Sequence, residues 1–198
     1  MRKPIVVGIT GASGAVYAVR LVNVLLGAGR DVHLSISPSG REVIRQELDR
    51  DVDLDSFRPD SLLPNSSDSA LHYHHYQDFM SSVASGSFLT GGMVVCPCSG
   101  TTLSSIAAGA SSNLIQRAAE VHLKERRRLI LVPRETPLSL PTIDNMRRAH
   151  EAGAVVLPAS PGWYHGVNSA DNLVDFVVAR ILDQLEIENE LIDRWGKG

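Results

Sequence analysis

The sequence predicts an α/β fold: a three-layer, Rossmann-like (flavodoxin-like) parallel sheet with helices on both faces. Short, continuous apolar runs alternate with segments of helical periodicity, which is typical of parallel strands buried on both sides. The first 48 residues read as strand, glycine-rich turn, helix, strand and helix, an order that requires a right-handed crossover between parallel strands. With 198 residues, the chain fits one domain, 1–198, with a full hydrophobic core.

Each element is predicted by its own pattern of apolar residues and breakers. Apolar runs predict strands at 5–9, 31–37, 92–97, 128–133 and 154–157, with a further short strand near 71–75. Helical patterns predict helices between the turn at 10–15 and Gly27, and at 41–48, 101–110, 114–126, 142–152 and 171–187. We expect residues 38–40 to end the second strand before the second helix begins. We expect residues 49–83 to form surface loops rather than a second domain.

Composition and charge exclude several classes of protein. The chain has 19 Lys and Arg against 22 Asp and Glu, a net charge of −3, whereas proteins that bind duplex nucleic acid usually carry a basic excess. Neither a signal-peptide core nor a run of 18 apolar residues occurs, so we expect no membrane partner and a cytoplasmic location. Cys96 and Cys98 are separated by a single residue, Pro97. This spacing gives a poor geometry for a disulfide and indicates reduced thiols.

Polar, glycine-rich clusters follow five of the predicted strands. Ligands of open parallel sheets bind at the carboxyl ends of the strands, so these clusters are expected to line one crevice. A single strand end rich in glycine and serine is most simply an ordinary turn, and only the coincidence of five favours function. The clusters are residues 11–14, 37–39, 98–102, 134–135 and 161–165.

Two helix starts are candidates for phosphate binding. Gly8, Gly11 and Gly14 form a G-x-x-G-x-x-G turn, which matches neither the dinucleotide-binding fingerprint nor a P-loop. Small residues at a helix start nevertheless offer backbone N–H groups to an anion. Residues 99–102 repeat this arrangement with three hydroxyls, so the pair suits a mononucleotide phosphate.

Basic and metal-ligating side chains are distributed unevenly. Lys124, together with Arg134 and Glu135, suits a second phosphate, whereas the arginine triplet at 126–128 reads as a solvated surface. The histidines between 72 and 76 lack partners at ligand spacing, so no metal site is predicted.

The chain resembles the UbiX-type flavin prenyltransferases, a branch of the homo-oligomeric flavin-containing decarboxylase-like flavoproteins. The resemblance covers nearly the whole chain and is weakest over residues 49–83. It rests on GITGASGAVYAVRL, SGSF, MVVCPCSGTTLSSIAAG, NLIQRAAEVHLKERRRLILVPRETPLS, NM at 145–146, GAVVLPASPGWYH, LVDFVVARILDQL and the terminal RWG. The block around RAAEVHLKERR and the PGWYH segment are long and specific.

The resemblance implies a transferase that joins a dimethylallyl group from dimethylallyl phosphate to N5 and C6 of reduced FMN. The product, prenylated FMN, would serve a UbiD-type decarboxylase. The family also implies a homo-oligomer, a dodecamer as in its relatives, and no metal.

The family motifs also imply which residues form the site. FMN would be held by Gly11, Ala12, Ser13, Ser37, Ser99, Gly100, Thr101, Thr102 and Arg134. The prenyl phosphate side would be lined by Ser85, Gly86, Arg117, Lys124, Glu135, Tyr164, Arg180 and Trp195, with Tyr164 and Arg180 donated by a neighbouring subunit. Ser13, Glu47, Lys124 and Glu135 would take part in catalysis.

Two other functions compete with this interpretation. An FMN-dependent decarboxylase of the same superfamily would use a catalytic histidine and a Pro-x-Met-Asn type substrate segment, where this chain has Arg134-Glu135-Thr136-Pro137. A flavin carrier without catalysis would have lost the phosphate-binding residues, yet Lys124, Glu135, Tyr164 and Arg180 are all present.

Overall fold

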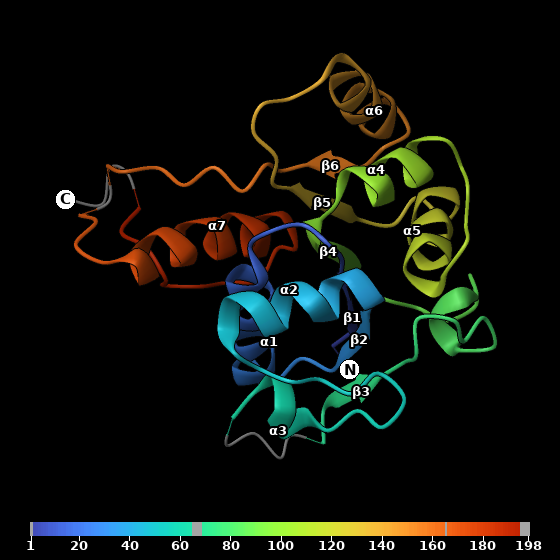
Figure 1. Cartoon of the computed structure of the whole chain (residues 1–198), viewed down its shortest axis with the longest axis horizontal. Coiled ribbons are helices and arrows are strands. Elements are labelled where there is room, and N and C mark those ends of the chain that lie inside the picture. Colours follow the sequence, from blue (N-terminus) through green and yellow to red (C-terminus); the bar gives the residue numbers. More distant parts are fainter. Residues whose placement is uncertain (1, 65–68, 165, 195–198) are drawn as a thin grey trace.

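A six-stranded parallel sheet of order β3-β2-β1-β4-β5-β6 forms the centre of the chain (Figure 1). The computed structural model describes residues 2–64, 69–164 and 166–194. The strands are β1 (Ile5–Ile9), β2 (Val32–Ile36), β3 (Leu71–Tyr73), β4 (Gly92–Cys98), β5 (Leu129–Pro133) and β6 (Val155–Val156). The order reverses between β1 and β4, and such a switch point is where sheets of this kind bind ligands.

Helices cover both faces of this sheet, so the predicted three-layer α/β fold is confirmed. The helices are α1 (Ala15–Gly27), α2 (Pro38–Leu48), α3 (Pro59–Leu62), α4 (Gly100–Ala107), α5 (Leu114–Lys124), α6 (Leu140–Glu151) and α7 (Ala170–Gln184), with a 3-10 turn η1 (Ser82–Ala84). Among the described residues, no helix is long and apolar enough to cross a membrane.

The core consists of two layers, one on each face of the sheet. In β1, Ile5 and Val7 pack in the layer with α1 and α7, whereas Val6 packs in the layer with α4 and α5. This alternation follows from the two-residue period of a strand, and both layers are apolar because helices cover both faces. All five residues of β1 are buried, which explains why its sequence is a continuous apolar run.

Two expectations from the sequence are wrong, one about where α2 begins and one about residues 49–83. Helix α2 begins at Pro38, where we expected a break, because Ser37 caps it and proline is well suited to the first helical position. Residues 49–83 are more than surface loops, since Leu62 and Leu63 are buried in the core layer of α1. The expected strand near 71–75 exists as β3 and forms one edge of the sheet.

The start of α2 lies directly against the end of β1. A Cβ atom at Gly40 would lie 2.6 Å from the backbone oxygen of Ile9, so only glycine fits there. Gly27, in the last turn of α1, has open space around the position of its missing Cβ.

We therefore expect Gly40→Ala to lower the stability of the protein and Gly27→Ala not to lower it. Gly40→Ala forces the α2 start away from β1 and should cost about 1–3 kcal/mol, as overpacking of cores does. Gly27→Ala adds helix propensity without a clash and should be neutral or stabilising by up to about 1 kcal/mol. Urea midpoints measured at one protein concentration compare the two variants. Equal midpoints would contradict the close approach.

Candidate functional site

The buried hydroxyl of Thr10 joins the carboxyl ends of β1 and β4. It donates a hydrogen bond to the carbonyl oxygen of Pro97 (2.8 Å) and accepts one from the backbone N–H of Ser99 (2.8 Å). The first turn and the start of α4 are thereby held side by side at the switch point. Sequence reasoning did not single out Thr10, although it is the polar residue directly after a buried strand.

Glu47, near the end of α2, caps the start of α1. Its carboxylate accepts hydrogen bonds from the backbone N–H groups of Gly14 (2.9 and 3.1 Å) and Ala15 (2.9 Å). Burial raises the pKa of Glu47, but hydrogen bonds from Ser13, Gly14 and Ala15 and the charge of Arg134 outweigh it and hold the pKa below its usual value. Glu47 is therefore an ionised carboxylate beside the predicted FMN residues.

This arrangement changes the expected role of the first turn. We expected the start of α1 to offer its N–H groups to a phosphate, but those of Gly14 and Ala15 already bind Glu47. The starts of α2 and α4 remain better placed for an anion. Ser37 caps α2 by accepting from the N–H of Gly40 (3.0 Å), and Ser99 caps α4 by accepting from the N–H of Thr102 (3.3 Å).

Arg134 and Glu135 follow β5 and reach toward the same edge. The Nε of Arg134 donates to the carbonyl oxygen of Ser13 (3.3 Å). A Cβ atom at Gly100 would lie 3.2 Å from Oε2 of Glu135, which places this carboxylate at the start of α4. Both residues also line a cavity of about 410 Å³ with residues 136–138 and 158–160.

The predicted residues at the carboxyl edge thus lie together in the structure. This carboxyl-edge cluster comprises Gly11, Ala12, Ser13, Ser37, Glu47, Ser99, Gly100, Thr101, Thr102, Arg134 and Glu135. Gly11 belongs to it through a close approach, since its missing Cβ would collide with the side chain of Ser39.

Four further predicted residues form a second cluster beside α5. Arg117 donates to the carbonyl oxygen of Ala84 (3.3 Å), which directly precedes Ser85. A Cβ atom at Gly86 would lie 3.0 Å from Nζ of Lys124. We call Ser85, Gly86, Arg117 and Lys124 the α5 cluster.

The α5 cluster extends toward the amino edge of the sheet, away from the carboxyl-edge cluster. At the start of α5, Ile115 packs on Gly8 near the end of β1, whereas Leu123 lines a cavity with Gly91, just before β4 begins. Helix α5 therefore runs from the carboxyl edge toward the amino edge of the sheet. Lys124 precedes β5 and Glu135 follows it, and the five residues of this strand span about 16 Å. The structure therefore does not bring Lys124 and Glu135 of one chain together, and their binding of a single phosphate stays a prediction.

The cations of the α5 cluster have surface carboxylates as partners. Arg117 pairs with Glu120 (3.0 Å) and Lys124 pairs with Glu125 (2.7 Å), and each side chain is between 36% and 48% exposed. Such exposed pairs typically contribute less than about 1 kcal/mol, so an incoming phosphate can replace the carboxylates at little cost.

Tyr164 and Arg180 lie near α7, the third location of predicted residues. The ring of Tyr164 packs edge-on against Phe176 at 5.8 Å, and Arg180 lies one turn further along the helix. Arg180 donates to Asp183 (2.7 Å), which also binds Arg194 through both carboxylate oxygens. Hydrogen bonding from Arg194 lowers the pKa of Asp183 and keeps it ionised. Trp195, the last predicted residue, is outside the described residues.

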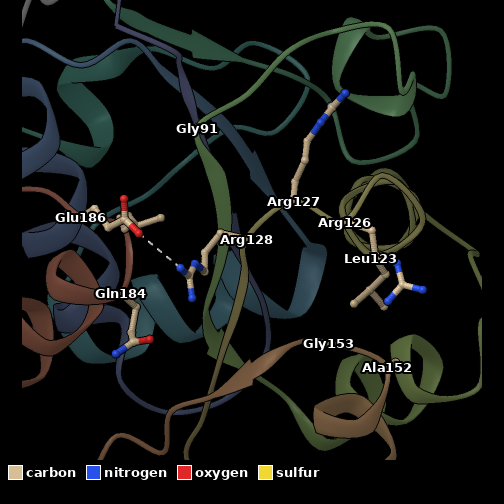
Figure 2. Close-up of a pocket in the computed structure, with 10 residues that line it drawn as sticks. Gly91, Leu123, Arg126, Arg127, Arg128, Ala152, Gly153, Gln184 and Glu186 are labelled. Atoms are coloured by element: carbon tan, nitrogen blue, oxygen red, sulfur yellow. Dashed lines mark hydrogen bonds and ion pairs between the residues drawn. The ribbon is translucent and has the colours of Figure 1, made fainter.

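A further cavity contains none of the predicted residues. Its volume is about 400 Å³, and it lies at the amino edge of the sheet (Figure 2). Arg128 points toward Glu186 at 3.5 Å across it, so part of its positive charge is already compensated. We therefore assign the candidate site to the two clusters rather than to this cavity.

Metal-ligating groups and reactive thiols would be two further kinds of site among the described residues. The residues described contain no group of three or more His, Cys, Asp or Glu side chains arranged to hold a metal ion. Cys96 and Cys98 are buried and free, and burial raises the pKa of the Cys98 thiol to about 12. A thiol with such a pKa is a poor nucleophile near neutral pH.

Comparisons with known proteins identify the family of the chain. The Flavoprotein family model matches residues 1–182. The chain is 47% identical to the flavin prenyltransferase UbiX of Halalkalibacterium halodurans, over 96% of this chain and 92% of the relative. It is 48% identical to that of Thermoplasma acidophilum, over 96% and 99% of the two chains. The chain therefore belongs to the flavoprotein family.

Solved structures show which group of flavoproteins the chain resembles in both fold and sequence. AnUbiX (PadA1), solved in complex with FMN and dimethylallyl pyrophosphate, superimposes with a TM-score of 0.88 at 36% identity and full coverage of both chains. A peptidyl-cysteine decarboxylase, EpiD, reaches a TM-score of 0.60 at 16% identity over 94% of this chain and 99% of its own, and so shares the fold alone. Within the flavoproteins, the chain belongs to the UbiX family of flavin prenyltransferases.

A buried histidine in α5 makes the stability of this region depend on pH. His122 is 1% exposed, with Nδ1 2.7 Å from the carbonyl oxygen of Ala118 and Nε2 2.7 Å from the hydroxyl of Thr90. Burial lowers the pKa of His122 to about 4, and the charge of Arg127 acts in the same direction. Between pH 6.5 and 4, the unfolded chain therefore binds more protons than the folded one.

We expect the folded state to lose stability as the pH falls from 6.5 toward 4, and His122→Gln to reduce this loss. The contribution of His122 is fully present above pH 6.5 and should decrease by on the order of 2–3 kcal/mol near pH 4. Urea midpoints of both proteins across this range measure the difference. His33, whose pKa burial also lowers to about 4, should maintain part of the slope in the variant. Parallel profiles would refute the role of His122.

Proposed function

We propose that this chain transfers a dimethylallyl group from dimethylallyl phosphate to N5 and C6 of reduced FMN. The carboxyl-edge cluster carries this proposal, since it joins two capped helix starts, Arg134 and two carboxylates at the switch point of the sheet. The likeness to a UbiX enzyme solved with FMN and dimethylallyl pyrophosphate supports both ligands. The product would be prenylated FMN, used by a UbiD-type decarboxylase.

The residues present fit FMN. The phosphate of a mononucleotide suits the starts of α2 and α4, where Ser37, Ser99 and Thr102 supply hydroxyls and the helix dipoles favour an anion. Arg134 adds a positive charge that is exposed and lies next to Ser13. Gly11 and Gly100 keep side chains out of this space. When bound in its reduced form, FMN supplies the electron-rich ring atoms that the dimethylallyl group joins.

The chain's own side chains assist the departure of phosphate from dimethylallyl phosphate. Breaking the allylic C–O bond of dimethylallyl phosphate transfers negative charge to the departing phosphate. Lys124, Arg117 and Arg180 stabilise this charge, and a positioned donor in a water-excluded site contributes about 3 kcal/mol. Tyr164 donates a further hydrogen bond, and Glu135 holds or protonates a phosphate oxygen. Ser13 and Glu47, hydrogen-bonded to each other, serve proton movement at the flavin side.

The distance between the clusters supports a site shared between two subunits. Lys124 and Glu135 lie at opposite ends of β5, so both reach one phosphate only if different protomers supply them. A UbiX-like protein of Escherichia coli O157:H7, 36% identical with a TM-score of 0.83 over 97% of this chain and 98% of its own, is described as dodecameric and FMN-dependent. We infer a homo-oligomer of this kind, in which the carboxyl-edge cluster of one protomer meets the α5 cluster of another.

The proposed setting is the cytoplasm, and the proposed unit is one domain, 1–198. Two free, buried cysteines suit a reducing compartment. One sheet with a core layer on each face accounts for the described residues as a single folding unit. No role for nucleic acid or membrane is proposed.

Anaerobic incubation with reduced FMN and dimethylallyl phosphate tests the activity directly. We expect mass spectrometry to show a flavin enlarged by one dimethylallyl unit, and no enlargement when dimethylallyl phosphate is omitted. Recovery of unmodified FMN from folded, flavin-loaded protein would contradict the proposed activity. Replacing the monophosphate by the diphosphate in a parallel reaction determines which donor the chain accepts.

Mixing two inactive variants tests the shared site. We expect Lys124→Ala and Glu135→Gln to bind FMN normally and to transfer the dimethylallyl group about a hundredfold more slowly, because each loses about 3 kcal/mol of charge stabilisation. Co-assembled at equal amounts, they should regain about a quarter of the normal rate, since random pairing restores both residues in one site of four.

The control for this mixing experiment is a single-cluster pair. Lys124→Ala mixed with Arg117→Ala should remain inactive when both residues of a site come from one protomer. Failure of the first pair to regain activity, after mass spectrometry confirms mixed assemblies, would place both residues in one protomer's site and contradict the geometry.

A further inference from the structure

Arg127 differs from the two arginines beside it. Figure 2 shows its side chain directed away from Arg126 and Arg128, toward the segment that precedes β4. Its guanidinium donates to the carbonyl oxygen of Phe88 (2.7 Å) and to that of Gly86. Only 14% of the side chain is exposed, whereas 42% of Arg128 is. The sequence alone suggested that all three arginines form a solvated surface, and for Arg127 this is wrong.

Two further contacts attach the same segment to α5. Arg117 donates to the carbonyl oxygen of Ala84, and the hydroxyl of Thr90 lies 2.7 Å from Nε2 of His122. Because Nδ1 of His122 faces a carbonyl oxygen and must donate to it, Nε2 accepts the proton of Thr90. Every second residue from 84 to 90 is therefore held by α5 or by the residues that follow it.

The alternate residues of this segment face the other way. Ser85 and Ser87 bond to each other through their hydroxyls (2.9 Å), and Leu89 is 61% exposed. Residues 85–88 form a turn, in which the backbone N–H of Phe88 donates to the carbonyl oxygen of Ser85 (3.3 Å), so this side of the segment is turned away from α5. The attachments through residues 84, 86, 88 and 90 thus fix where the Ser85 hydroxyl and the backbone of Gly86 lie relative to Lys124.

We propose that Arg127 is a positioning residue that holds Ser85 and Gly86 beside Lys124 and so forms the phosphate-binding part of the α5 cluster. The inference rests on the proposed function for the identity of the phosphate ester. The guanidinium is suited to this task because its rigid fork spans two carbonyl oxygens at once, whereas a lysine ammonium on its flexible stem does not hold both in a fixed geometry.

The charges around Arg127 also favour phosphate binding beside Gly86. Glu125 lies 2.7 Å from Lys124 and 3.9 Å from Arg127, so one carboxylate is shared by two cations. The three groups retain a net positive charge next to Gly86. Phosphate at this place therefore meets fixed backbone and a cationic surface together.

Arg127→Lys keeps the charge and removes the fork, and Arg126→Lys is the matched control on the adjacent residue. We expect Arg127→Lys to raise KM for dimethylallyl phosphate about tenfold, which corresponds to losing about one charge-assisted hydrogen bond, with FMN affinity unchanged within twofold. Amide hydrogen exchange at 85–89 should accelerate about tenfold or more. Arg126→Lys should leave all three quantities unchanged within twofold.

Thr90→Val tests the other end of the segment without altering any charge. It should shift KM and exchange in the same direction as Arg127→Lys, and it keeps the inference testable if the latter variant does not fold. A binding measurement separates the inference from the proposed function. Inorganic phosphate should slow exchange at 85–87 in the unmodified protein and in Arg126→Lys, but not in Arg127→Lys.

The outcomes divide clearly. Faster exchange at 85–89 with unchanged KM and unchanged phosphate protection would overturn the inference, and so would unchanged exchange. If the unmodified protein leaves FMN unmodified, the proposed function fails. In that case, loss of phosphate protection in Arg127→Lys would still support the positioning role, and equal protection would overturn it.

Discussion

The junction between β1 and β4 is the constraint on which the site depends. The hydroxyl of Thr10 is buried and bonded on both sides, to the carbonyl oxygen of Pro97 and to the N–H of Ser99. A buried backbone group left without its partner costs about 1–3 kcal/mol, so this bridge keeps the two strand ends at a fixed separation. The first turn and the start of α4 then border one space, into which residues from α2 and β5 project.

Glu47 decides how that space can be used. By occupying the N–H groups at the start of α1, it removes the most obvious phosphate site of a fold with this strand order and leaves the starts of α2 and α4. An ionised carboxylate also repels a phosphate placed next to it. The same contact thus gives α1 its cap and, under the proposed function, excludes the anion from one helix start and leaves two others for it.

The parts of the fold that could be predicted from the sequence are those set by continuous burial. β1 and β5 are buried at every residue, and their apolar runs have the expected bounds to within a residue. The start of α2 was missed because proline and glycine usually break elements, and here Ser37 converts them into a helix start. The carboxyl-edge cluster was predictable in outline because parallel strands end at one edge.

Other features depend on contacts that no local pattern contains. The capping of α1 by Glu47 joins residues 33 positions apart, and the bond from Arg127 to Gly86 joins residues 41 apart. The separation of Lys124 from Glu135, by contrast, was present in the sequence. One precedes and the other follows the same five-residue strand, and a helix that leads into a parallel strand must run opposite to it.

That separation makes assembly part of the chemistry. Alone, a protomer has its phosphate-binding cations paired with Glu120 and Glu125 on its surface, and these pairs are weak enough to be exchanged. In the proposed assembly, the carboxyl-edge cluster of another protomer would cover them, and the same cations would lose solvent and interact more strongly with a developing phosphate charge. Under this proposal, charge stabilisation would be delayed until both ligands meet, because neither half of the site reaches the other within a single chain.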